Sequence, residues 1–245
     1  MRARQLPFIV AAALALAAPA RADDPVNPDR PGTSNGPLTV GDRHLQVEAG
    51  GNVLGGDGDD LYTLPVTLRY GVGPWAELRL ESDTLTVQGA DSGVGDLFVG
   101  GKATFHRANP SLGVMARLRL PSGSRAFRQD GVTPDFTLLG TVALSESVSV
   151  EANALLALPR DGAGDRFAQW TYAATTSFAL NPKWTAFAEL SSLGPGERGG
   201  PRQGQADGGV AYLVNNDLML DVDLIVGLTQ SSPDWGATMG FSKRF

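Results

Sequence analysis

Apolar and polar residues alternate along most of the chain beyond Arg43, with a period of two. In residues 62–70, Tyr, Leu, Val, Leu and Tyr take every second position, and Thr, Pro, Thr and Arg lie between them. Residues 76–83, 112–120 and 218–228 follow the same pattern. A β-strand places successive side chains on opposite faces, whereas an amphipathic helix needs apolar residues three and four positions apart. No segment of useful length has the helical spacing, so the pattern predicts an all-β protein.

The links between the predicted strands are alternately short and long. Five short links contain turn residues such as Gly-Pro and Asn-Pro and fall at roughly 71–74, 107–110, 145–147, 181–183 and 215–217. Six longer links are rich in Gly, Asp, Pro and Arg and fall at roughly 55–60, 86–93, 121–132, 159–166, 194–205 and 229–234. These links join twelve strands, and the alternation of short turns with longer loops is typical of outer-membrane barrels.

The last predicted strand has two different faces. Trp235, Ala237, Met239 and Phe241 lie on one face, and small or polar residues alternate with them on the other. An apolar outer face with a small or polar inner face suits a barrel wall in lipid. We therefore expect two partners: membrane lipid around the wall and, through the strand that ends in Phe245, the outer-membrane assembly machinery.

Aromatic residues gather near both ends of the predicted strands. The loop-end residues are Tyr62, Phe136, Trp170, Tyr172 and Trp235, and the turn-end residues are Tyr70, Phe105, Phe178, Trp184, Tyr212, Phe241 and Phe245. Two such belts match the preference of aromatic rings for the lipid–water boundary. A sheet that spans hydrocarbon must close on itself, because every backbone polar group there needs a partner. We predict a transmembrane antiparallel β-barrel of about twelve strands over residues 43–245, with short periplasmic turns and longer outer loops.

Two segments precede the predicted barrel. Residues 1–22 combine an early pair of arginines, a short apolar stretch and the small-x-small sequence Ala20-Arg21-Ala22, which together predict a cleaved signal peptide. Residues 23–42 are rich in Pro, Gly and Asp and have no period. We expect them to form an extended periplasmic leader that lies at the barrel mouth or folds into the barrel. The combined features predict the outer membrane of a Gram-negative bacterium as the location.

Charge and composition argue against several classes of function. The chain has 20 Lys and Arg against 26 Asp and Glu, and loss of the three arginines in residues 1–22 would leave 17 against 26. This balance argues against a nucleic-acid partner, which needs a basic face. The absence of cysteine removes disulfide scaffolds and thiolate metal sites, and two histidines are too few for most zinc chemistry. We expect neither a cofactor nor a metal.

Charged residues fall on the predicted lumen face, where function would lie. The selectivity candidates are Arg69, Glu77, Arg79, Glu81, Asp83, Lys102, Arg117, Arg119, Asp221 and Asp223, and the same face receives Asp96, Glu151, Glu189 and Asp207. Neighbouring strands can pair such residues, for instance Arg69 with Glu77 or Glu81. Two interpretations stay open: ion-pair ladders that brace a narrow lumen, or a constriction whose acidic and basic arcs set solute selectivity.

The sequence favours an outer-membrane channel for passive uptake of small solutes, and two alternatives stay open. The first is a closed barrel that acts as a structural or adhesive surface protein, with binding on residues 121–132 and 194–205. The second is a barrel enzyme, which would need a nucleophile or activated water beside a well-held base, usually His, near the outer rim. His44 and His106 are both expected at the periplasmic end, so we predict no catalytic site.

Six segments of the chain form an ordered set. They are Asp29-Arg30-Pro31, LRYGVGPWAELRL (68–80), SGVGDLFVGGKATF (92–105), RLRLPSGS (117–124), DGGVAYLVNNDLMLDVDLIVGL (207–228) and SPDWGATMGFSKRF (232–245). In order and spacing they resemble the MetA-pathway of phenol degradation family. The resemblance implies an outer-membrane transporter, linked in some relatives to uptake of aromatic or other hydrophobic compounds. The Gly-Thr-Ser-Asn-Gly-Pro continuation after Pro31 differs from the aromatic and acidic one of relatives, so the resemblance assigns no role to the leader.

Overall fold

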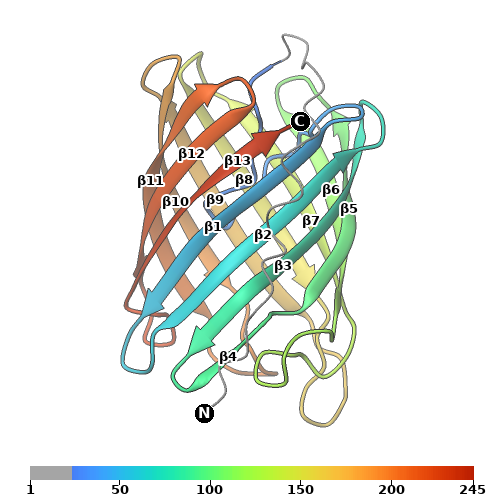
Figure 1. Ribbon diagram of the computed structural model, residues 1–245, viewed down its shortest axis with the longest axis vertical. Coiled ribbons are helices and arrows are strands. Elements are labelled where there is room, and N and C mark those ends of the chain that lie inside the picture. The colour runs from blue at the N-terminus through green and yellow to red at the C-terminus, as the bar shows by residue number, and fades with distance from the viewer. Residues whose placement is uncertain (1–23) are drawn as a thin grey trace, which may run out of the picture.

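The computed structural model describes residues 24–245, so the predicted signal peptide lies outside the described residues. The strands, labelled as in Figure 1, are β1 (Leu45–Gly55), β2 (Leu61–Gly71), β3 (Ala76–Gln88), β4 (Asp91–Gly93), β5 (Leu97–His106), β6 (Ser111–Leu120), β7 (Thr133–Ala143), β8 (Val148–Ala157), β9 (Gln169–Ala179), β10 (Trp184–Leu193), β11 (Gln203–Asn215), β12 (Leu218–Gly227) and β13 (Trp235–Arg244). Residues 24–245 contain no helix that is long and apolar enough to cross a bilayer.

The strands form one antiparallel sheet that closes into a barrel (Figure 1). Successive strands pair along the chain, and β1 pairs with β13, which joins the two ends of the sheet. The short strand β4 pairs only with β3, so twelve strands form the wall. Closure pairs both edges of the sheet, as the hydrocarbon environment requires. The predicted twelve-stranded antiparallel barrel is confirmed.

Short turns lie at one end of the barrel and long loops at the other (Figure 1). The C-terminus lies at the end with the short turns, which we call the turn end; the opposite end is the loop end. One boundary differs from the sequence prediction, which placed a loop over residues 86–93. Residues 86–88 instead continue β3 because they pair with β2, and residues 91–93 form β4.

The two faces of the wall differ as the alternation predicts. Many large apolar side chains are exposed, and the aromatic ones include Tyr62, Tyr70, Phe105, Phe136, Trp170, Tyr172, Phe178, Trp184, Trp235 and Phe241. The largest fully buried side chains are mostly charged or polar and include Arg69, Lys102, Gln46, Glu48, Glu77 and Asp223. A water-soluble domain buries its apolar residues and exposes its charges. The reverse arrangement is that of a barrel with lipid outside and a polar lumen.

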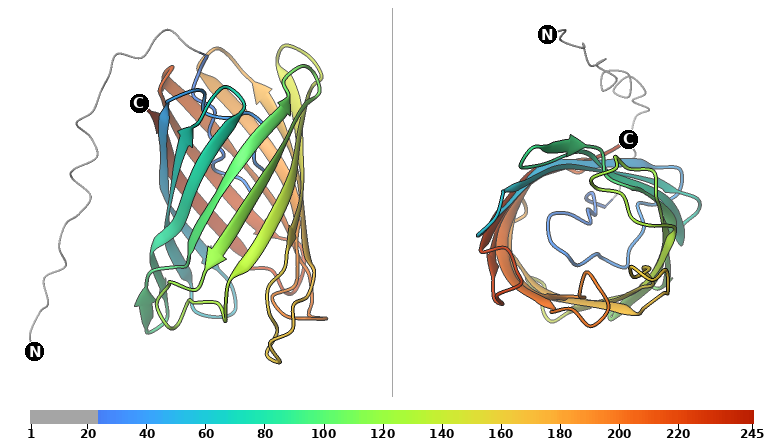
Figure 2. Two further views of the ribbon diagram at one scale, coloured as in Figure 1. Left: turned by 90° about the vertical axis from the view of Figure 1, so that its right-hand side faces the viewer. Right: turned by 90° about the horizontal axis from the view of Figure 1, so that it is seen from below.

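Residues 24–42, the described part of the predicted leader and called the leader below, occupy part of the lumen. Seen along the barrel axis, they form a loop inside the ring of strands (Figure 2). The backbone N–H of Val26 donates to the carbonyl of Asn216 in the turn between β11 and β12, at 2.7 Å. The chain returns to the same end of the barrel, where β1 begins. Of the two positions considered from the sequence, mouth or interior, the leader takes the interior.

Candidate functional site in the barrel lumen

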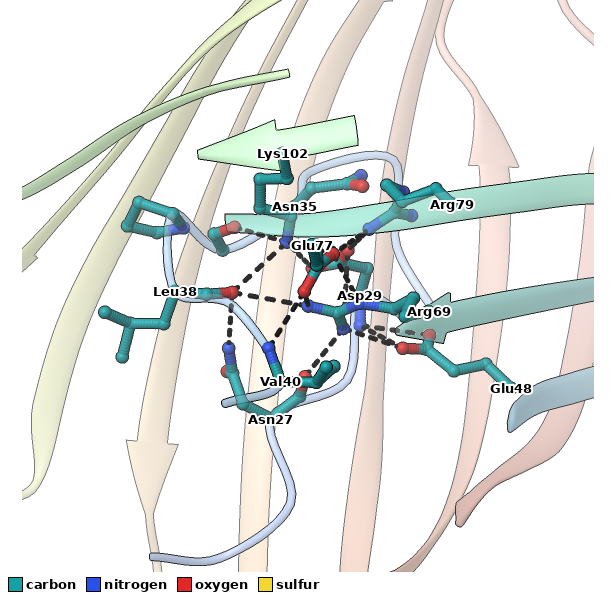
Figure 3. Close-up of polar contacts among 12 residues, drawn as sticks. Asn27, Asp29, Asn35, Leu38, Val40, Glu48, Arg69, Glu77, Arg79 and Lys102 are labelled. Carbon is teal, nitrogen blue, oxygen red and sulfur yellow. Dashed lines mark hydrogen bonds and ion pairs between the residues drawn. The ribbon is translucent and has the colours of Figure 1, made fainter. Parts of the chain in front are cut away.

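Asp29 of the leader lies among three cations of the wall (Figure 3). Lys102 Nζ lies 2.8 Å from each of its carboxylate oxygens, Arg69 Nη1 lies 3.4 Å from Oδ2, and Arg79 Nη1 donates to Oδ2. None of these four side chains is more than 5% exposed. Burial favours the neutral acid, but attraction to Arg69, Lys102 and Arg79 outweighs it and holds the pKa of Asp29 below its ordinary value of 3.8. Asp29 therefore anchors the leader as a carboxylate.

Two acids of the wall share these cations and also hold the leader backbone. Glu77 accepts from Arg69 Nε at 2.8 Å and Nη2 at 3.1 Å, and Glu48 accepts from Arg69 Nη1 at 2.8 Å. Glu48 accepts the N–H of Asp29 at 3.1 Å, and Glu77 accepts that of Val40 at 2.9 Å. Removing one member of such a buried network would leave an uncompensated charge, which is strongly destabilising.

The leader has no regular secondary structure in residues 24–42, so its peptide groups need partners from the wall. Arg69 Nη1 donates to the carbonyl of Asn27 at 2.8 Å, and Lys102 Nζ donates to that of Gly36 at 2.8 Å. The Thr104 hydroxyl donates to the carbonyl of Pro37 at 2.7 Å. The wall therefore fixes the path of the leader backbone as well as its charge.

The middle of the leader contacts other strands of the wall. Glu189 of β10 accepts the N–H groups of Thr33 and Ser34 at 2.7 and 2.9 Å. Asn153 of β8 exchanges two hydrogen bonds with the backbone of Asn35, at 2.7 and 3.0 Å. Because β8 and β10 lie across the barrel from β2 and β3, the leader bridges the lumen (Figure 2).

A further group of ion pairs continues along the wall from the Asp29 cluster. Arg79 Nε donates to Glu81 at 2.8 Å, and Arg117 bridges Glu81 at 2.7 Å and Asp135 at 3.0 Å. These residues come from β3, β6 and β7. Each carboxylate in this group therefore has a cationic partner.

Asp96 holds the long loop over residues 121–132. Its carboxylate accepts from Arg119 Nε at 2.9 Å and from the N–H groups of Gly123 and Gln129 at 2.9 and 3.0 Å. Burial raises its pKa, but the two backbone hydrogen bonds and Arg119 together lower the pKa below the ordinary 3.8. The loop is thus fastened at the loop end of the lumen by an ionised side chain.

The lumen has two sides of different charge. We call the lumen face of β1–β6 the paired arc and that of β7–β12 the acidic arc; β7–β12 contain no Lys or Arg. Asp135 of the acidic arc pairs with Arg117, and Asp221 pairs with Arg30 of the leader, both at 3.0 Å. Four further acids of the acidic arc form no ion pair with any residue in 24–245: Glu151, Glu189, Asp207 and Asp223.

Glu189 and Asp207 lie directly opposite each other in the β10–β11 register. Like charges in that position repel. Asp207 and Asp223 each have one buried carboxylate oxygen without a hydrogen-bond partner in residues 24–245. The acidic arc therefore gathers acidic side chains that pair with no cation among the described residues.

A cavity of about 350 Å³ lies between the leader and the wall. The leader lines one side, and the other is lined by side chains that include Ser111, Thr141, Ser149, Glu151, Thr175, Ser177, Thr185 and Glu189. This volume is within the range of pockets that hold small molecules. The leader thus narrows the lumen but leaves room along the acidic arc.

The ten selectivity candidates lie on the lumen face in five different settings. Arg69, Glu77, Arg79 and Lys102 belong to the network around the leader, and Glu81, Arg117 and Arg119 belong to the ion pairs beyond it. Asp221 binds Arg30 of the leader. Asp223 is 1% exposed on the acidic arc, and Asp83 is half-buried on β3, where its carbonyl accepts from Gly95 at 2.7 Å. Arg69 pairs with Glu77, whereas Glu81 pairs with Arg79 and Arg117.

Sequence reasoning missed the residues that connect the leader to these candidates. Asp29 and Arg30 were noticed only as part of a family resemblance, because an aperiodic segment gives no orientation for its side chains. Glu48 has the lumen parity of β1, so the alternation alone could have found it. The contacts of Glu189 with the leader join residues more than 150 positions apart, and no local pattern predicts them.

The closed sheet, apolar exterior and charged lumen define the class of protein: a twelve-stranded outer-membrane β-barrel of the porin type. Residues 28–245 match the family described as "Putative MetA-pathway of phenol degradation", and the chain belongs to this family, as the resemblance predicted. No curated protein matches the sequence.

Solved porins share the fold of this chain. The NanC porin superposes with a TM-score of 0.55 at 11% identity, over 81% of this chain and 98% of that one. The KdgM porin superposes with a TM-score of 0.56 at 13% identity, over 82% and 99%. Likeness at such identities concerns the fold, because unrelated functions share folds.

Proposed function

We propose that this protein is a passive outer-membrane channel for small solutes and that the leader forms a fixed part of its lining. The observation that carries the proposal is the cavity between the leader and the wall, whose wall side carries hydroxyl groups and the carboxyl groups of Glu151 and Glu189. Passive passage needs a polar path and a favourable field, so neither a cofactor nor a catalytic group follows from it.

The charge of the two arcs supports a preference for cations. The cations of the paired arc are neutralised by neighbouring acids, including Asp29. The acidic arc keeps four carboxylates without a cation among residues 24–245. A solute that moves along the acidic arc therefore meets a net negative field, which attracts cations and repels anions.

Small phenols are the neutral solutes to test first. The family description refers to phenol degradation. The hydroxyl groups of Ser149, Thr185 and their neighbours in the cavity can donate to or accept from a phenolic hydroxyl. We infer that such compounds can pass along the same path as ions.

A closed structural or adhesive barrel is the second candidate, and the dense anchoring of the leader favours it. A barrel enzyme has less support, because His106 lies at the turn end, with Nδ1 2.6 Å from the carbonyl oxygen of Pro110. His44 directly precedes β1 at the same end of the barrel. Both histidines are therefore far from the outer rim, where a lipid or peptide substrate would be reached.

Single-channel conductance in a planar bilayer tests the channel directly. The refolded protein is first checked for barrel formation by a heat-modifiable gel shift. We expect discrete current steps with a reversal potential that indicates cation preference. A folded barrel without conductance would contradict the proposal and favour the closed barrel.

We also infer that the assembly machinery recognises β13 and the terminal Phe245. Phe245 donates its N–H to the carbonyl of Leu45 at 2.7 Å, so the last residue takes part in closing the barrel. Phe245→Ala is expected to reduce the amount of heat-modifiable barrel in cells more than Phe241→Ala does. Equal amounts from the two variants would contradict a special role of the last residue.

A further inference from the structure

The wall contains an interruption of pairing between β1 and β2. Their residue pairing stops after residue 49 and resumes at residue 52, in an unchanged register. The two skipped positions are Gly50 opposite Pro65 and Gly51 opposite Leu64. Proline has no N–H to donate to the carbonyl of Gly50, and both skipped pairs depend on that hydrogen bond, so Pro65 accounts for the interruption. A missing ladder hydrogen bond is costly in hydrocarbon, so the wall is weaker at this proline than at an ordinary ladder position.

The neighbouring ladder is irregular at the same height. The β2–β3 register shifts between Thr63 and Pro65, which leaves Leu64 paired with neither neighbouring strand. The Thr84 hydroxyl donates to the Leu64 carbonyl at 2.9 Å in place of a backbone donor. The wall is therefore held by fewer backbone hydrogen bonds around residues 64 and 65 than elsewhere along these strands.

An apolar groove of about 400 Å³ lies over this interruption. Its outward-facing lining consists of Gly51, Val53, Tyr62, Leu64, Leu85, Val222, Ala237 and Met239. Behind them it also reaches Asn52, Thr63 and Thr238, which have the lumen parity of their strands. The groove thus extends from the lipid-facing surface into the thickness of the wall.

Arg30 of the leader covers the same place from the lumen. Its guanidinium lies so close to Gly50 and Gly240 that a Cβ atom at either position would clash with it. Arg30 Nη2 donates to Thr238 Oγ1 and to Asp221, both at 3.0 Å. Arg30 therefore lies against the lumen side of β1 and β13 at the height of the groove.

We propose that the groove and the interruption behind it form a lateral route by which a small apolar solute passes from the lumen into the membrane. The proposal rests on the channel function inferred above. An acyl chain of a neighbouring lipid would need only a depression in the outer surface. The weak position at Pro65 instead has the groove on its lipid side and Arg30 on its lumen side, and this favours a solute from the lumen as the occupant.

Filling the groove tests the route. Gly51→Leu places a side chain in the groove, and a Cβ atom at Gly51 meets only Leu64 within 4 Å, at an ordinary 3.5 Å, so the barrel should fold. Ala49→Leu is the matched control, because it adds the same side chain on the same face of β1 outside the groove. The probe is N-phenyl-1-naphthylamine, an apolar dye that fluoresces on reaching the membrane interior of cells with a lipopolysaccharide outer leaflet.

We expect Gly51→Leu to slow dye uptake several-fold and to leave single-channel conductance unchanged, whereas Ala49→Leu should change neither. Equal dye uptake in both variants would overturn the lateral route and leave the channel proposal intact. Absence of conductance in the unmodified protein would contradict the channel itself, independently of the dye result.

A reversible lock gives a second test that does not depend on filling. Gly51→Cys with Leu64→Cys places two thiols at directly opposite outward positions, where a disulfide can replace the missing pairs. Val53→Cys with Tyr62→Cys is the control, because that pair is already part of the ladder. Oxidation should slow dye uptake only in the first variant, and reductant should restore it. Equal dye uptake with and without reductant in that variant would contradict the proposal.

Discussion

The paired arc and the acidic arc of the lumen carry charge in opposite ways. On the paired arc, Arg69, Arg79 and Lys102 are buried, and each contacts at least two carboxylates. On the acidic arc, Glu151, Glu189, Asp207 and Asp223 have no cation among residues 24–245. Charges that neutralise one another at short range leave little field for a passing solute, whereas uncompensated ones act over the width of a lumen. We therefore assign a structural role to the first arc and propose that the second sets the field that a solute meets.

The leader contacts both arcs, so changes in the leader are the most direct way to distinguish the roles of the two arcs. Asp29 supplies a negative charge that the paired arc lacks, and Arg30 supplies a positive charge to Asp221. The remaining contacts of the leader with the acidic arc use neutral groups: the N–H groups of Thr33 and Ser34, the Ser34 hydroxyl and the backbone of Asn35. The leader is thus held by ion pairs on the paired arc and, apart from the Arg30–Asp221 pair, by neutral hydrogen-bonding groups on the acidic arc.

Deleting residues 24–42 behind an intact signal peptide should have the largest effect. The lumen would lose its bridging segment, and we expect single-channel conductance to rise several-fold. The cations of the paired arc would also lose Asp29, so the preference for cations should weaken. Planar-bilayer recordings measure both quantities. A Gly/Ser segment of the same length is the control, because it keeps chain in the lumen without the anchoring side chains. Unchanged conductance after deletion would contradict a constricting role.

Asp29→Asn should have the next largest effect, because it leaves three buried cations one carboxylate short. Breaking a buried ion pair by removing one partner costs about 3 to 5 kcal/mol. We expect a lower temperature for loss of heat modifiability and frequent openings to a larger conductance. Asp161→Asn, on an exposed loop where Asp161 pairs with Arg198, is the matched control and should have neither effect. Equal stability of the two variants would contradict the anchor.

The pH dependence of the anchor follows from the lowered pKa of Asp29. A carboxyl group whose pKa is lower in the folded state stabilises that state at pH values above its unfolded pKa and loses this contribution as pH falls through the folded value. The conductance of the unmodified protein should therefore show no Asp29-dependent change between about pH 8 and about pH 5. The assignment would be contradicted if openings became more frequent as the pH falls through this range and if this pH dependence were absent from Asp29→Asn.

The strands could be predicted from the sequence because each wall residue faces either lipid or the lumen. The alternating hydrophobicity of the side chains indicates which face each residue occupies. Arg69, Glu77 and Lys102 were found in this way. The individual ion pairs were harder to predict. Glu81 lies near more than one cation, and the register between strands decides which of them it contacts; in the structure it pairs with Arg79 and Arg117. The roles of Asp29 and Arg30 were inaccessible, since a segment without a period gives no alternation from which to place a side chain.

The combined change Glu189→Gln, Asp207→Asn and Asp223→Asn should alter selectivity more than stability. These substitutions remove acidic groups from the acidic arc and keep side-chain size, and Glu189→Gln keeps one oxygen, which can accept one of the two leader N–H groups that Glu189 binds. We expect the permeability ratio of potassium to chloride to fall several-fold toward unity. Reversal potentials in a salt gradient measure it. Arg117→Gln on the paired arc is the comparison and should raise the ratio, because it leaves Asp135 without its cation and Glu81 with Arg79 alone. A ratio that stays the same after the triple change would place the solute path elsewhere.

Asp96→Asn should have the smallest effect, because it weakens the anchor of one loop outside the wall. The amide oxygen can still accept a hydrogen bond from Gly123 or Gln129, but the ion pair with Arg119 is lost. We expect the loop over residues 121–132 to become more sensitive to protease added from outside, with mean conductance and ion selectivity unchanged. Limited proteolysis of intact cells measures the first, and bilayer recordings measure the second. Asp57→Asn, on the exposed loop between β1 and β2, is the control and should leave cleavage of the 121–132 loop unaltered. If Asp96→Asn instead changed ion selectivity as much as the triple change in the acidic arc, the field in the lumen would depend on the loop end, and the division between a structural arc and a selective arc would be wrong.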